Sequence, residues 1–241
     1  MIVRLRYFFI IALVLYWPVI FLFAHMPNVP GWILRTQMSD KTLHYLGYLL
    51  LVFFWWFSIY PNTKPTLFSR PLWFTIAMML IYGATDEWLQ RFTHRTPDIM
   101  DLAADMLGVL TGLFIFGVVG LRLSALGVTT VCIFVLTSLC KTDPLSFVPF
   151  LDILFYVGAY ALVTLLWIGY LWKRPSLSRI EIIFLSLLMP AILLSITLLV
   201  ASMTGKLFAI DRLIAAAAGI ASPVLAAAAT LCFKRPKAAR G

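Results

Sequence analysis

Residues 182–203 read IIFLSLLMPAILLSITLLVASM, a run without a single charged side chain. A helix needs about 20 mainly apolar residues to cross a hydrocarbon core of roughly 30 Å, so this run is long enough to span a membrane. Its apolar residues do not alternate with polar ones, as they would in a barrel strand, and an unalternating span in lipid must be helical. The run therefore predicts a transmembrane α-helix.

Similar apolar blocks occupy most of the remaining chain. With 62% hydrophobic and only 12% charged residues, the composition excludes a water-soluble fold. We expect an all-α, polytopic transmembrane helix bundle of about eight helices, with no room for a separate soluble domain. The expected helices cover 7–24, 42–60, 72–88, 97–120, 123–140, 150–172, 182–203 and 210–233.

The net charge of +9 comes mainly from short basic runs between the apolar blocks. Such runs orient membrane proteins, so no nucleic-acid partner is expected. With an even number of spans, both termini lie on the same face of the membrane. That face then holds most of the basic residues, including the Lys173-Arg174 loop and the Lys234-Arg235 tail. Because basic loops stay inside, both termini are predicted to be cytoplasmic.

A weak internal similarity appears when the chain is compared with itself at an offset of 111 residues. It pairs Tyr45 with Tyr156 and Gly108 with Gly219. This predicts two parallel four-helix repeats, residues 1–120 and 121–241. Polar residues of the first half, such as His44, fall on apolar residues of the second, so a polar site is expected only in residues 1–120.

Three short segments concentrate charge at the same expected ends of the helices at 42–60, 72–88 and 97–120. They are DKTLH at 40–44, DEWLQR at 86–91 and HRTPDIMDLAAD at 94–105, and in the predicted topology all lie at the extracytoplasmic side. Ionisable groups at membrane depth are costly and usually mark functional sites. This accumulation is the main functional signal in the sequence.

Helical spacing predicts which side chains share a face. Asp40 and His44 are four residues apart, and Glu87 lies three residues before Gln90. On the helix at 97–120, Asp101 and Asp105 continue into a stripe of small residues that lets a neighbouring helix approach closely. Carboxylates held there need partners, and Lys41, Arg91 and Arg95 are the expected counter-charges.

Simpler interpretations exist for several of these residues. Thr96 and Pro97 resemble the N-cap and first residue of a helix, so Asp98 is interpreted as a stabiliser of the helix terminus. His44 could be a hydrogen-bonded core histidine, although an Asp–His pair is also a recurring arrangement for proton transfer. Asp105 lies about two turns inside the helix, where a buried, partnered site is the better interpretation.

A divalent metal site built from His44, Glu87, Asp101 and Asp105 is chemically feasible, and would favour hard cations. No dense ligand motif such as HExxH accompanies these residues. The sequence therefore predicts no metal and no cofactor.

The ordered set of motifs resembles the VanZ-like family of bacterial membrane proteins. The family pattern is similar to Asp40-Lys41-x-x-His44, then Glu87-x-x-Gln90, then Arg95, then a final motif in which an Asp is followed by Asn and two Gly. Here that final motif is Asp101, Asp105, Gly108 and Gly112, so Asp105 replaces the Asn. The resemblance covers about 7–120 and implies a bacterial cytoplasmic-membrane protein whose prototype is linked to reduced teicoplanin susceptibility.

Two functional interpretations remain open beside a purely structural one. In the first, the protein is an enzyme acting on an envelope lipid or lipid-linked cell-wall precursor, with His44, Glu87 and Asp101 as candidate catalytic residues. Substrate-binding residues would be Asp40, Lys41, Gln90, Arg95 and Asp105, with Arg95 holding an anionic group. In the second, the same cluster binds a lipid head group during transport. In the third, it joins helices within an envelope assembly.

Overall fold

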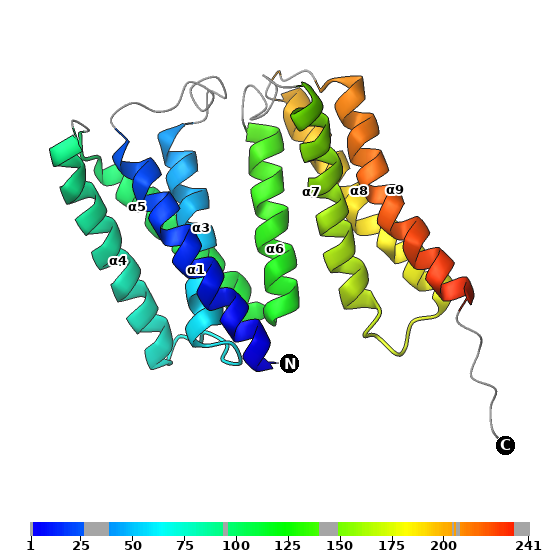
Figure 1. Cartoon of the computed structure of the whole chain (residues 1–241), viewed down its shortest axis with the longest axis horizontal. Coiled ribbons are helices and arrows are strands. Elements are labelled where there is room, and N and C mark those ends of the chain that lie inside the picture. Colours follow the sequence, from blue (N-terminus) through cyan, green and yellow to red (C-terminus); the bar gives the residue numbers. More distant parts are fainter. Residues whose placement is uncertain are drawn as a thin grey trace. The chain divides into compact units, whose positions relative to one another are not determined.

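The computed structural model describes residues 2–26, 39–93, 96–139, 149–203, 205 and 208–233, and helices are the regular secondary structure within them (Figure 1). This confirms the all-α prediction. The first helices are α1 (Ile2–His25), α3 (Asp40–Ile59), α4 (Arg70–Gln90), the 3₁₀ turn η1 (Arg91–Thr93) and α5 (Ile99–Val118). They are followed by α6 (Leu121–Phe134), the π-helical turn η2 (Val135–Leu139), α7 (Pro149–Leu171), α8 (Arg179–Met203) and α9 (Ile210–Phe233).

Seven helices in the described chain are long and apolar enough to cross a membrane. Their outward faces carry large apolar side chains, including Leu15, Phe114 and Leu165, which are more than half exposed and would meet lipid. The α4 helix covers the helix expected at residues 72–88. It is less apolar than the seven candidate spans because it carries Arg70, Asp86 and Glu87. The chain is therefore a multi-pass membrane protein.

The chain divides into two compact units, Met1–Val128 and Thr129–Gly241. The division lies within α6, somewhat later than the boundary expected after Gly120. Each unit has its own buried side chains, so each is described by itself.

The first unit is organised around the contact between α3 and α5, the most extensive helix pair in it. Glycine makes this close approach possible, because a Cβ atom on Gly108 would collide with the carbonyl oxygen of Tyr45. One turn further, a Cβ on Gly112 would lie 2.6 Å from Cγ1 of Val52. The close packing of α3 against α5 fixes the position along the two helices at which their polar side chains meet.

The second unit repeats this packing, with α7 and α9 in the places of α3 and α5. A Cβ on Gly219, the counterpart of Gly108, would collide with the carbonyl oxygen of Val157 in α7. The buried face of α9 also follows that of α5 at the offset of 111 residues, with Val109 and Leu113 matched by the buried Ile220 and Val224. The shared packing supports the expected repeat beyond its weak sequence similarity.

Candidate functional site

Polar side chains gather where three helix ends of the first unit meet. Figure 1 shows the first residues of α3 and α5 and the last residues of α4 at the same end of this unit, because successive helices run in opposite directions. His44 comes from α3, Glu87 from α4, and Asp101 and Asp105 from α5; all four are buried. The three charged segments of the sequence are therefore brought together, as predicted.

The central contact joins His44 to Asp105. The Nδ1 atom of His44 lies 2.9 Å from Oδ1 of Asp105, whose side chain is completely buried. An imidazole N–H donating to a carboxylate fixes the orientation of the ring and its tautomer. In that tautomer, Nε2 of His44 carries a free lone pair. The expectation that Asp105 is buried and partnered is confirmed.

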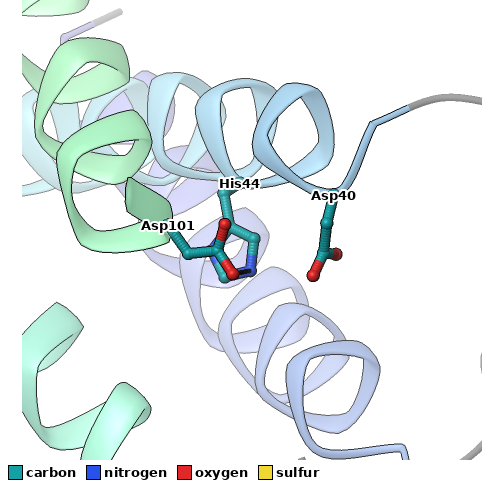
Figure 2. Close-up of side chains that lie close together, drawn as sticks. All are labelled: Asp40, His44 and Asp101. Atoms are coloured by element: carbon teal, nitrogen blue, oxygen red, sulfur yellow. Dashed lines mark ion pairs between the residues drawn. The ribbon is translucent and has the colours of Figure 1, made fainter. Parts of the chain in front are cut away.

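The other edge of the His44 ring faces two more carboxylates. Figure 2 shows the imidazole between Asp101 and Asp40, and the Nε2 atom lies 3.9 Å from Oδ2 of Asp101. Ligand atoms of these three residues all lie within 4.8 Å of one another. A neutral Nε2 and a carboxylate oxygen are both acceptors, so a proton or a cation is needed between them.

Lys41 closes the outer rim of the cluster. Its Nζ atom donates to Oδ2 of Asp98 at 2.7 Å and to Oδ1 of Asp101 at 3.2 Å. The hydrogen bond from Lys41 lowers the pKa of Asp98 below its ordinary value. About half of the Lys41 side chain is exposed, so this ammonium group is also accessible from outside the protein.

Asp98 begins α5 and connects it to α4. Its side chain accepts a hydrogen bond from the Met100 amide, which makes it the N-cap. The expected start at Thr96 and Pro97 is wrong, because Asp98 supplies the capping oxygen and α5 begins at Ile99. The backbone N–H of Asp98 donates to Oε2 of Glu87 at 2.9 Å, which holds that side chain against the first turn of α5.

Several polar atoms around the cluster lack hydrogen-bond partners among the described residues. They include Oε1 of Glu87 and Nε2 of Gln90, both buried. Burying such groups unpaired typically costs about 1–3 kcal/mol each. Helices that merely packed together would be more stable with apolar residues at these positions.

Two further residues of the site were missed at the level of sequence. Asp86 is buried at the end of α4, and its Oδ1 atom lies 3.6 Å from Nδ1 of His25 at the end of α1. Asp86 lies one helical turn before Gln90, and this spacing is the signal that could have placed it on the same buried face. The His25 contact depends on the packing of α1 against α4, which no local pattern indicates.

The expected counter-charges are only partly present. Lys41 pairs with Asp101 as predicted. Arg91 is exposed and forms no ion pair with the acids that the structure describes, and Arg95 lies outside the described residues. Asp86, Glu87 and Asp105 therefore have no lysine or arginine partner within the described part of the chain.

The second unit has no matching acidic cluster in its described residues. Its buried carboxylate is Asp152, left unassigned from the sequence, which accepts a 2.7 Å hydrogen bond from Nε of Arg212. The positions matching His44, Glu87 and Asp105 hold Phe155, Leu198 and Ala216. The acidic cluster that the structure describes therefore lies in the first unit.

No protein-family model, curated protein or solved structure matches this chain. What defines the protein is therefore its own fold and site. Its class is a multi-pass helical membrane protein with a buried histidine–carboxylate cluster at one end of its first unit.

Proposed function

We propose that this chain is a VanZ-like protein of the bacterial cytoplasmic membrane that binds or acts on an envelope lipid or lipid-linked cell-wall precursor at the extracytoplasmic face. The observation that carries the proposal is the convergence of His44, Glu87, Asp101 and Asp105 from three helices. Buried ionisable groups gathered in this way within a membrane protein usually serve a substrate, an ion or a proton.

The chemistry of the cluster suits proton transfer. With Asp105 at Nδ1, the imidazole of His44 presents Nε2 toward Asp101. A histidine oriented by a carboxylate is a common general acid or base, because the carboxylate fixes its tautomer and stabilises the imidazolium form. We assign proton transfer to His44, with Glu87 or Asp101 as its partner.

Lys41 gives the rim a group that recognises anions. Its exposed ammonium lies beside Asp98 at the entrance to the cluster and could reach the phosphate of a lipid head group. Arg95 is expected to take the same role, as the family resemblance implies. Counted over the whole chain, basic residues predominate on the side predicted to be cytoplasmic, mainly through the Lys173-Arg174 loop and the Lys234-Arg235 tail. This bias favours an extracytoplasmic location for the site.

A purely structural role is less well supported. Helix contacts that serve only stability normally satisfy their buried polar atoms. Glu87 and Gln90, one helical turn apart, each leave a buried polar atom without a described partner, whereas the Asp152–Arg212 bridge leaves one, Oδ1 of Asp152. A link to teicoplanin susceptibility follows from the family resemblance and belongs to the same proposal.

Lipid transport is the second candidate, and the repeated packing of the two units favours it. Parallel structural repeats are typical of several transporters. In this alternative the cluster binds a head group without changing it, and no covalent step occurs.

Single substitutions separate these candidates. His44→Ala, Glu87→Gln and Asp101→Asn are produced in cells, and membrane abundance and total lipid and precursor composition are measured for each. An enzyme predicts altered composition at unchanged abundance. A transporter predicts unchanged total composition with altered exposure of a head group between leaflets.

Asp152→Asn is the matched control, because Asp152 is a buried, paired carboxylate outside the cluster. A structural cluster predicts two results together. The three site variants would lose membrane abundance to the same extent as Asp152→Asn, and the variants that still reach the membrane would leave the amount and the leaflet distribution of lipids unchanged. That result would overturn the proposal.

A further inference from the structure

We propose that His44, Glu87 and Asp105 bind one divalent transition-metal ion, with Zn²⁺ and Mn²⁺ as the best matches. Each residue offers one ligand atom, and the three atoms lie within 4.8 Å of one another in a fully buried group. Ligands of a tetrahedral ion lie about 3.4 Å apart when the metal–ligand bonds are near 2.1 Å. Small side-chain rotations would bring the three atoms to that spacing.

An unpartnered oxygen in the same place points to a ligand. Glu87 is only 7% exposed, and its Oε1 atom has no hydrogen-bond partner among the described residues. The Asp98 amide already holds the other oxygen of Glu87, so Oε1 could coordinate an ion without disturbing that hydrogen bond. An ion bound through Nδ1 of His44 would take the place of the proton that this atom shares with Asp105.

The charge of the cluster also favours a cation. Asp86, Glu87 and Asp105 are buried without a lysine or arginine partner in the described chain, while Lys41 is engaged by Asp98 and Asp101. Histidines contact Asp86 and Asp105, whereas Glu87 has no cationic partner among the described residues, and a buried carboxylate without one is strongly unfavourable. A bound divalent ion would neutralise Glu87 and Asp105 directly.

The donor set selects the kind of ion. One imidazole nitrogen and two carboxylates suit Zn²⁺ or Mn²⁺, since Mg²⁺ and Ca²⁺ favour oxygen ligands alone. From the sequence, these residues could be named only as a feasible ligand set, because the ligands come from three helices and match no compact motif. The inference does not depend on the proposed lipid function, since the protein itself supplies the ligands.

A second group, Asp40, His44 and Asp101, also meets the distance criterion. We favour the buried group because Asp101 already pairs with Lys41, whose ammonium would repel a cation. The two groups share His44 but differ in their acids, so substitutions can distinguish them.

The experiment uses the full chain, purified in detergent without a polyhistidine tag and stripped with a chelator. After equilibration with Zn²⁺ or Mn²⁺ and removal of free ion, bound metal is measured by mass spectrometry, and the melting temperature is recorded with and without the ion. We expect one ion per chain and a higher melting temperature with metal, because the ion joins α3, α4 and α5.

Glu87→Gln is the deciding variant, since it preserves side-chain size and an acceptor for the Asp98 amide. We expect it and Asp105→Asn to weaken binding by more than about tenfold and to remove the metal-dependent rise in melting temperature. Asp152→Asn should leave both intact. Absence of stable binding in the unmodified chain would overturn the proposal, as would loss of binding in Asp40→Asn or Asp101→Asn with retention in Glu87→Gln.

Discussion

Arg212 in α9 donates to Asp152 in α7 at 2.7 Å, and this pair occupies the positions that Asp101 and Lys41 occupy in the first unit. Both bridges join residues 60 positions apart, but the signs are exchanged, with the acid on α7 in one unit and on α5 in the other. The repeat thus preserves an ion pair between corresponding helices rather than the charge of either residue. We infer that the Asp152–Arg212 bridge belongs to the scaffold of the second unit, whereas the His44–Asp105 contact belongs to the site.

Reversing the bridge of the second unit tests the scaffold role. Asp152→Lys places a second cation beside the largely buried Arg212, and we expect a loss of about 3 kcal/mol in stability, read as a lower melting temperature. The double variant Asp152→Lys with Arg212→Asp restores opposite charges and should recover most of that loss. A double variant no more stable than Asp152→Lys alone would show that the exchange of signs is not tolerated.

Gly108 tests the close packing of α3 and α5. A methyl group there would meet the backbone of Tyr45, which cannot move aside cheaply, so Gly108→Ala should lower stability by about 1–3 kcal/mol. Gly158→Ala is the matched control in a helix, because nothing lies within 4 Å of its Cβ position. Thermal melting of both purified variants checks the expectation, and equal melting temperatures would contradict it.

The sequence predicted the helices well because membrane spans are determined by hydropathy and length. The predicted 210–233 and 182–203 agree with α9 and α8 to within a few residues. The start of α5 was wrong because Thr96 and Asp98 are both good capping residues, and only the contacts of Asp98 with Met100 and Lys41 decide between them.

The site was predictable only in part, for a similar reason. Spacing of three and four residues placed His44, Glu87 and Asp105 on polar faces of separate helices, but it did not indicate which faces meet. The direct His44–Asp105 contact and the involvement of Asp86 and His25 depend on helix packing between distant segments. Likewise, the unpartnered oxygen of Glu87 becomes evident only once its neighbours are known.

Asp98 gives a prediction for pH dependence. The hydrogen bond from Lys41 lowers the pKa of Asp98 below its ordinary value of 3.8, so the ionised carboxylate stabilises the fold. This contribution to stability is fully present above pH 3.8 and is lost as the pH falls through the lowered pKa. Asp98→Asn keeps a capping side chain but removes the charge. We expect it to melt below the unmodified chain at neutral pH, with the difference shrinking at pH values under 3.8. A difference that is independent of pH would contradict this account of Asp98.

The proposed orientation predicts which end of the first unit faces the exterior. Lys41 lies at the exposed rim of the site, and Lys64 lies in the loop between α3 and α4, near the opposite end of those helices. The two substitutions Lys41→Cys and Lys64→Cys each introduce one thiol at these positions. In a background in which Cys132, Cys140 and Cys232 are replaced, a membrane-impermeant thiol reagent applied to intact bacterial cells should label the first and not the second. The reverse labelling pattern would place the site on the cytoplasmic side.

The most direct measurement of the central claim is the lipid and precursor composition, by leaflet, of cells producing His44→Ala, Glu87→Gln or both at equal membrane abundance. Residues that act as one unit show non-additive effects, so the double variant should change the composition or its leaflet distribution no more than either single variant. Additive changes, or no change in any of the three, would contradict a shared functional site.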